Sequence, residues 1–324
     1  MNKYKKILVV CPSNMTTGGP EALHQLVRHM IDLGLNAYIV YLPFGVTAKS
    51  PKAYEKYQAP VHSYEDASGN IIIFPEIYPM LALKVNNAKA GLWWLSLDNF
   101  LERKNISVVR DKYHLIRAII RRKKPLFGAK SLKNLINFSQ TYHSTQYLLS
   151  CGITPVPLID SINEAFLNDK YQGYKNSKQN VILFNPTKGK EVTKQLIKKF
   201  PNYKFIPLIG YSPEEMSKLL YDAKLYIDFG HHPGRDRMPR EAAIHGCCLI
   251  SGVLGSAANE VDLPIPKQYK LNPRDDDFFF RFGVMVEDIF AQFDLHFEAF
   301  EQYRHYLKSE PAIFKQQIAD YFLG

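Results

Sequence analysis

The feature that most constrains the fold is an alternation of short apolar runs with amphipathic segments, which begins near the N-terminus. Ile7–Val10 is a β-branched run, and a turn containing Gly18 and Gly19 separates it from an amphipathic stretch over residues 20–33. A second apolar run follows at Ala37–Leu42. Such short apolar runs are typical of strands buried on both faces of a parallel sheet. The order therefore predicts the opening of a doubly wound sheet.

The same alternation starts again in the second half, after the polar residues 169–179, which are predicted to be a linker. The two blocks therefore predict an α/β fold with two Rossmann-like domains, over residues 1–168 and 180–305. A C-terminal helix over 306–324 is expected to pack back on the first domain. The further elements expected are strands at Ile71–Phe74, Gly91–Leu97, Asn105–Val109, Val181–Phe184, Tyr203–Leu208, Leu225–Phe229 and Cys248–Ser251, and helices at Ser144–Cys151, Lys190–Phe200, Pro213–Ala223 and Pro239–His245.

Charge and hydropathy narrow the class of protein. The net charge of +10 favours an anionic partner, which can be a nucleotide, an anionic membrane surface or a nucleic acid. No stretch approaches the ~20 apolar residues that span a bilayer. The four cysteines form no CxxC pair, which is typical of buried, reduced thiols. These features predict a cytoplasmic protein.

The most distinctive motif is the stretch from Asp228 to Ala243, where three arginines crowd the predicted start of a helix near Pro239. They are Arg235, Arg237 and Arg240. Arginine normally favours the other end of a helix, whereas the open N–H groups and the dipole at a helix start attract anions. Guanidinium groups hold phosphate oxygens in bidentate pairs. The stretch therefore predicts a phosphate site, the alternative being a solvated charged loop.

The elements around these arginines resemble the donor-binding half of the GT-B glycosyltransferases. The resemblance rests on the glycine-bearing loop before Glu241, on Ala242-Ala243, and on the later run Gly255–Glu260. It implies that Glu241 binds the ribose of a nucleotide. The large retaining GT-B family has a first glutamate where this sequence has Pro233, so the donor sugar and the stereochemistry of transfer stay open.

Two glycine loops extend the resemblance. Asn185–Gly189 is similar to the family's loop with a Lys-Gly pair, which implies that Lys188, or its rival Lys190, holds the donor diphosphate. Thr16–Gly19 is similar to the family's first loop, where the absence of a Cβ permits close approach of a ligand. The implied fold is two domains facing each other across a cleft. The implied donor-binding residues are Gly18, Gly19, Lys188, Gly234, Arg235, Arg237, Arg240, Glu241, Ser256 and Glu260.

Candidate catalytic residues follow predicted strands or lie in the donor loop. Asp98 follows the Trp-rich strand, where it can act as a general base if the enzyme inverts; the alternative is a carboxylate that caps a turn. His143 is a candidate acceptor residue. His231 and His232 lie inside the donor loop and are also predicted to be catalytic. No metal site is expected, because these histidines have no third ligand at a convincing spacing.

A basic segment lies between Glu102 and Lys133, with eleven basic residues against two acidic ones. Apolar residues alternate with part of it at helical spacing, as in helices that lie on anionic membranes. The alternative is a solvated helix face. The residues predicted to contact an acceptor or a membrane are Arg117, Arg121, Arg122, Lys123 and Lys124.

The expected activity is transfer of a sugar from a nucleotide sugar to a hydroxyl of a surface polysaccharide, lipid-linked oligosaccharide or glycolipid, without a bound metal or other cofactor. The expected partners are the nucleotide sugar, the glycan acceptor and the inner face of the cell membrane. A non-hydrolysing nucleotide-sugar 2-epimerase is the alternative within the same fold. A basic nucleic-acid-binding or scaffold protein is the alternative of another class, although no nucleic-acid-binding motif is present and no nucleic acid is expected.

Overall fold

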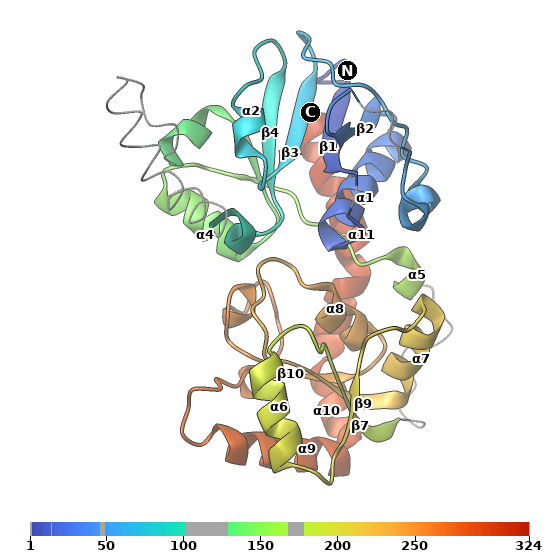
Figure 1. Cartoon of the computed structure of the whole chain (residues 1–324), viewed down its shortest axis with the longest axis vertical. Coiled ribbons are helices and arrows are strands. Elements are labelled where there is room, and N and C mark those ends of the chain that lie inside the picture. The colour runs from blue at the N-terminus through green and yellow to red at the C-terminus, as the bar shows by residue number, and fades with distance from the viewer. Residues whose placement is uncertain (1, 14, 46–48, 102–128, 168–177, 324) are drawn as a thin grey trace. The chain divides into compact units, whose positions relative to one another are not determined.

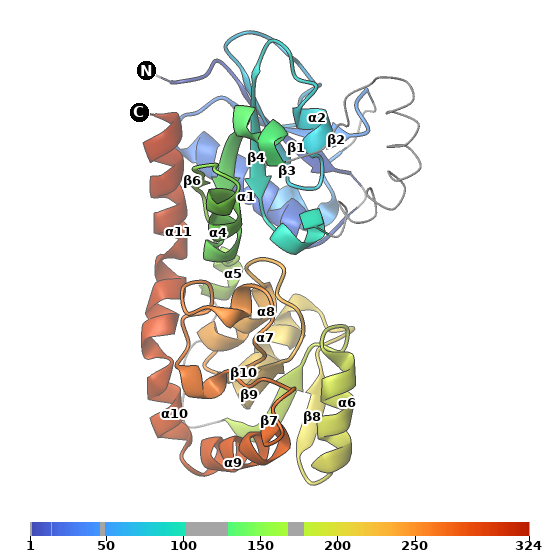
Figure 2. The same cartoon turned by 90° about the vertical axis from the view of Figure 1, so that its left-hand side faces the viewer.

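The structure is a computed structural model that describes residues 2–13, 15–45, 49–101, 129–167 and 178–323. The chain divides into two compact units (Figures 1 and 2). Unit 1 comprises Met1–Asp160 and Ala312–Gly324, and unit 2 comprises Ser161–Pro311. Each unit contains one parallel β-sheet with helices packed against it, so the prediction of two Rossmann-like halves is confirmed.

Unit 1 is built on a six-stranded parallel sheet with the order β2-β1-β3-β4-β5-β6. Its strands are β1 (Ile7–Pro12), β2 (Ala37–Leu42), β3 (Ile71–Pro75), β4 (Lys89–Trp94), β5 (Ile136–Ser139) and β6 (Val156–Pro157). Its helices are α1 (Gly18–Asp32), α2 (Pro79–Ala82), α4 (Tyr142–Ser150), η1 (Lys52–Tyr57), η2 (Ala129–Asn134) and the C-terminal part of α11 (Glu301–Phe322).

The apolar run of β1 is continuous because both of its faces are buried. Ile7 and Val9 pack on one side in a cluster that includes α1 and the end of α11, whereas Leu8 and Val10 pack on the other side with α2 and α4. On the first side, the Phe314 ring of α11 contributes to the cluster. Burying one such side chain stabilises the fold by about 1.5–3 kcal/mol. The two-sided burial is what leaves only the ends of the strands free for function.

Unit 2 has a four-stranded parallel sheet with the order β10-β9-β7-β8. From β7 the chain passes to β8 on one side of β7 and then returns to β9 on its other side. A topological switch point therefore lies between β7 and β9. Sheets of this kind bind ligands at such a point, beyond the carboxyl ends of the strands. The elements are β7 (Gln179–Phe184), β8 (Lys204–Pro207), β9 (Ala223–Asp228), β10 (Cys248–Ser251), α5 (Glu164–Leu167), α6 (Lys190–Lys199), α7 (Pro213–Asp222), α8 (Arg237–Ile244), η4 (Ser256–Ala258), η5 (Lys267–Tyr269), α9 (Phe278–Ala291), α10 (Phe293–Ala299) and the start of α11.

Several predicted boundaries need correction. The strand predicted to reach Leu97 ends at Trp94, because residues 97–101 are helical and Ser96 Oγ accepts the Asn99 N–H at 3.1 Å. The helix predicted to begin near Pro239 starts at residue 237, since proline is tolerated in a first turn. Strand β5 was not among the strands predicted. The predicted strand Asn105–Val109 and most of the predicted linker lie outside the described residues.

Candidate functional site

Two loops meet at the switch point of unit 2. The loop after β7 ends in Gly189, whose φ of +58° is in the left-handed region. A Cβ at Gly189 would lie 2.6 Å from the carbonyl carbon of Phe229 and 2.7 Å from the backbone nitrogen of Gly230, both in the loop after β9. Glycine is therefore required here for two reasons, its backbone conformation and the close approach of the second loop. The packing holds Lys188 beside the loop after β9.

A third loop, which follows β10, supports the loop after β9 from the other side. The backbone N–H of His232 donates to Leu254 O at 3.3 Å, and the N–H of Ser256 donates to His232 O at 2.8 Å. The Ser256 hydroxyl donates to Gly234 O at 2.6 Å. Two predicted donor residues, Gly234 and Ser256, and the predicted catalytic residue His232 thus lie in one hydrogen-bonded assembly, and Ser256 contacts the loop rather than open solvent. Glu260 lies exposed beyond η4.

The basic side chains of this assembly differ in their exposure. Lys188 is 31% exposed at its side chain; its ammonium contacts the Asp236 carboxylate and lies 3.4 Å from His231 O. Arg237 is 28% exposed and lies 3.5 Å from the Glu241 carboxylate, one helical turn away. Each cation thus contacts a largely buried carboxylate, while its own side chain stays partly exposed, where a bound anion can reach it.

The other two arginines of the motif point into the unit. Arg235 and Arg240 are only 3% and 4% exposed, and both guanidinium groups donate to the fully buried carboxylate of Glu310 on α11. Arg240 also donates to the carbonyl oxygens of Arg235 at 3.0 Å and of Asp236 at 3.3 Å. The sequence predicts these two arginines to be donor-binding residues, and that role stays a prediction. Their observed contacts hold the loop to α11.

The start of α8 is open to an anion. Asp236 occupies the N-cap position, but its side chain makes no capping hydrogen bond because it turns toward Lys188 and His232. The N–H groups of the first turn thus lack the side-chain acceptor that usually satisfies one of them. Because α8 begins at Arg237, its open end carries a partly exposed guanidinium. This arrangement suits a phosphate group.

His232 is buried between two carboxylates of the same loop region. Its Nε2 lies 3.6 Å from Asp228 Oδ1, and its Nδ1 lies 3.5 Å from Asp236 Oδ2. One ligand atom from each of these three residues lies within 4.8 Å of the others, which is a metal-compatible spacing. The ammonium of Lys188 already supplies a cation to the Asp236 carboxylate. The expectation that no metal is needed stays a prediction.

Asp228 makes the stability of this assembly dependent on pH. Burial alone would raise the pKa of Asp228. The neighbouring His232, the hydrogen bond from the Gly230 N–H and the positive charge of Lys188 outweigh burial and hold this pKa below its ordinary value. The folded state thus binds fewer protons than the unfolded state. The contribution of Asp228 to stability is complete above the unfolded pKa of about 3.9 and is lost as the pH falls below it.

Replacing Asp228 with Asn should therefore lower the free energy of unfolding at pH 7 by about 1–3 kcal/mol, because the Tyr226 hydroxyl and the Gly230 N–H lose a charged acceptor. The difference from the wild type should shrink when both proteins are compared near pH 3. Urea unfolding at the two pH values measures this effect. An equal difference at both values would show that the charge of Asp228 contributes nothing.

Unit 1 brings two predicted residues together at the carboxyl edge of its own sheet. Asp98 follows β4 and His143 lies in the first turn of α4, after β5; His143 Nε2 is 3.7 Å from Asp98 Oδ2. Thr141 orients α4 through a capping box with Ser144. Asp98 itself lies in the first turn of the helical residues 97–101, a favourable place for a carboxylate. The pair is a partly buried polar group at the edge where sheets of this kind bind ligands.

Sequence reasoning missed several acidic residues that organise these two edges. Glu76 follows β3, is buried, and accepts the Leu95 N–H at 3.1 Å. Asp228 and Asp236 flank His232, and Glu310 binds the two buried arginines. The only local signal was the position of Glu76 and Asp228 at or after the end of an apolar strand.

Gly18 and Gly19 open α1 in unit 1, after β1. A Cβ at Gly19 would come no closer than 3.9 Å to Leu95, which is an ordinary contact. Packing among the described residues therefore does not require glycine at this position. The predicted approach of a ligand to this loop remains a reason for it.

The predicted membrane-contacting residues Arg117, Arg121, Arg122, Lys123 and Lys124 lie outside the described residues. Within the described part of the chain, no helix combines the length and the apolar character needed to cross a bilayer.

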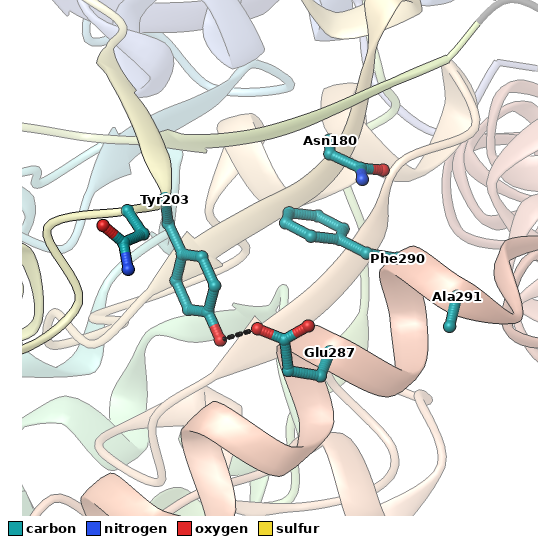
Figure 3. A pocket seen from close by; sticks show the side chains of 6 residues that line it. Asn180, Tyr203, Glu287, Phe290 and Ala291 are labelled. Carbon is teal, nitrogen blue, oxygen red and sulfur yellow. Dashed lines mark hydrogen bonds between the residues drawn. The ribbon is translucent and has the colours of Figure 1, made fainter.

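A shallow pocket of about 430 Å³ lies elsewhere in unit 2, between the start of β7, the approach to β8 and α9 (Figure 3). Tyr203 donates to Glu287 at 2.6 Å in it, with Asn180 and Phe290 beside them. Because it lies near the amino ends of these strands, the pocket is separate from the switch-point loops.

No known family model and no characterised protein matches this chain by sequence, but its structure resembles several solved structures. HepE from Anabaena, in complex with UDP-glucose, has a TM-score of 0.64 at 11% identity, covering 97% of this chain and 98% of that one. The chain has the GT-B fold. Sucrose-phosphate synthase from Thermosynechococcus elongatus (TM-score 0.58, 10% identity, 97% of both chains) and a glycosyltransferase from Rickettsia africae (0.54, 14%, 99% and 95%) share this GT-B fold.

Proposed function

We propose that this GT-B chain is a glycosyltransferase that uses a nucleoside diphosphate sugar. The observation that carries the proposal is the arrangement at the switch point of unit 2. There the partly exposed cations of Lys188, in the loop after β7, and of Arg237, the first residue of α8, lie at the uncapped start of that helix. This is where a sheet of this kind binds its ligand, and both the charges and the N–H groups suit a diphosphate.

In this proposal the protein supplies the charge that a diphosphate leaving group needs. Lys188, Arg237 and the start of α8 stabilise the negative charge that develops as the glycosidic bond to the diphosphate breaks. Glu241 binds the ribose. His231 is exposed beside Gly255 and can contact the sugar, whereas buried His232 holds the two aspartates around it. No metal is required.

Unit 1 then holds the acceptor. Asp98 accepts the proton of the attacking hydroxyl if the reaction inverts, and His143, 3.7 Å away, orients the carboxylate or the hydroxyl. The basic segment between residues 102 and 133 favours an acceptor at an anionic membrane surface, such as a lipid-linked glycan or a glycolipid. The HepE complex with UDP-glucose and an alpha-glucosyltransferase complex with UDP support a uridine nucleotide as the donor's carrier.

The proposal is tested by a thermal-shift screen of UDP, GDP, ADP and CMP against a polynucleotide of equal phosphate concentration. A nucleotide that binds the folded state stabilises it by about 2.7 kcal/mol when present at 100 times its dissociation constant. Stabilisation by one nucleotide and not by the polynucleotide is expected. Stabilisation by the polynucleotide alone would support a nucleic-acid-binding scaffold instead.

Replacing Glu241 with Ala should weaken the binding of a ribonucleotide more than the binding of its 2′,3′-dideoxy analogue. Glu241 lies in α8 one turn after Arg237, and the proposed bond joins its carboxylate to the ribose hydroxyls. Loss of a hydrogen bond to a charged group costs about 1.5–3 kcal/mol, which is roughly a 10- to 150-fold rise in dissociation constant. Titration calorimetry with both ligands measures the effect. Equal losses for the two ligands would remove the ribose role.

A further inference from the structure

Glu310 of α11 is the acceptor on which the buried part of the donor loop converges. Its carboxylate is fully buried. One oxygen accepts Nη2 of Arg235, and the other accepts Nη1 of Arg240 at 3.0 Å and the backbone N–H of Ile162 at 2.9 Å. Arg235 also donates to the Tyr306 hydroxyl at 3.1 Å. A buried charge is costly when it loses its partners. A carboxylate held by this many donors therefore fixes the position of the loop that supplies them, because movement of the loop would leave the carboxylate uncompensated.

The Glu310 carboxylate also joins the start and the end of unit 2, because it belongs to the end of the unit and binds the backbone of its start. Ile162 is the second residue of the unit, and Glu310 immediately precedes Pro311, which is its last residue. Pro311 lies inside α11 and cannot donate a helical hydrogen bond, so the helix is weakened just after Glu310. The donor loop is therefore fixed to the two ends of the unit by one side chain.

We propose that Glu310 is a positioning residue for the donor loop. Resting on the proposed function, the inference is that the two buried arginines do not contact the diphosphate themselves. They hold the backbone from Gly234 to Arg237 so that the start of α8, exposed Arg237 and neighbouring Lys188 face the phosphates together. Sequence reasoning assigned all three arginines to the ligand; burial separates two that build the site from one that reaches it.

The test compares Glu310→Gln, Glu310→Asp and the control Glu301→Gln, an exposed glutamate on the same helix. Glutamine removes the charge and one acceptor oxygen, whereas aspartate keeps both on a shorter stem. In Glu310→Gln, hydrogen exchange of residues 230–237 should rise at least tenfold with no change in the peptide of β9, and the dissociation constant for UDP should rise at least tenfold. Glu310→Asp should lie between this variant and the wild type, and Glu301→Gln should match the wild type.

Two results would overturn the positioning role. One is unchanged exchange of the donor loop in Glu310→Gln. The other is an equal rise throughout unit 2, because Glu310 would then only hold the fold together. If the wild type does not bind UDP or another nucleoside diphosphate, the proposed function fails, while the exchange of the loop without nucleotide still decides whether Glu310 positions it.

Discussion

Replacing Gly255 with Ala should lower the free energy of unfolding by about 3–5 kcal/mol and should weaken nucleotide binding at least tenfold. Gly255 has φ +66° and ψ −138°, a conformation that residues with a side chain rarely adopt and that costs about 1–3 kcal/mol. A Cβ there would lie 2.2 Å from the carbonyl oxygen of His232, too close for any relaxation short of moving the backbone. The clash therefore adds to the backbone strain, so the expected loss of unfolding free energy is larger than that of most single substitutions.

The binding loss follows from the place of the clash. The backbone of His232 exchanges hydrogen bonds with Leu254 and Ser256, so moving it displaces the loop that carries Arg237. Gly210→Ala is the matched control, because Gly210 also has a positive φ, +80°, but has no neighbour within 4 Å of the added Cβ. Urea unfolding should show only about 1–2 kcal/mol for the control, which is the backbone strain alone. Similar losses of unfolding free energy in both variants would show that the contact with His232 does not contribute to the effect of Gly255→Ala.

The fold was largely predictable because its signal is local and repeated. Strands buried on both faces leave continuous apolar runs, and Ile7–Val10 and Val181–Phe184 both lie within observed strands. The Ser-x-x-Glu spacing of Ser212 and Glu215 indicates a capping box at the start of α7, and the two hydrogen bonds of that box are present at 3.3 Å and 2.8 Å. Strand β5 was missed because Asn137 and Ser139 interrupt its apolar run. The strand at Trp93-Trp94 ended early because a capping serine, not an apolar residue, decides where the following helix begins.

The site was only partly predictable because its electrostatics are made by residues far apart in sequence. Arg235 and Arg240 form a charge cluster in the sequence, but nothing local indicates that Glu310 neutralises them, since Glu310 is about 70 residues further along the chain on α11. Lys188 and Asp236 are likewise joined only by the approach of two loops. A charge motif therefore predicts that a region is charged, while burial decides which of its charges face a ligand.

Lys188→Ala and Arg237→Ala should each weaken binding of the nucleoside diphosphate by about 1.5–3 kcal/mol, a 10- to 150-fold rise in dissociation constant, because each removes a hydrogen bond to a charged phosphate oxygen. Both side chains are partly exposed and lie where the ligand is proposed to bind. The stability of the folded protein should change less, since both replaced side chains are partly exposed and partly exposed ion pairs contribute about 0–1 kcal/mol. Titration calorimetry with UDP measures the first effect and urea unfolding the second.

Lys190→Ala provides the control for Lys188, because Lys190 is a lysine of the same Lys-Gly-Lys run that lies exposed at the first position of α6. The ammonium of Lys188 is held by Asp236 beside the loop after β9, which places it next to the start of α8. The Lys190 variant should therefore bind UDP within about twofold of the wild type, as expected for a surface substitution outside the site. A larger loss for Lys190→Ala than for Lys188→Ala would transfer the phosphate role to Lys190. Unchanged binding in both Lys188→Ala and Arg237→Ala would exclude the switch point as the diphosphate site.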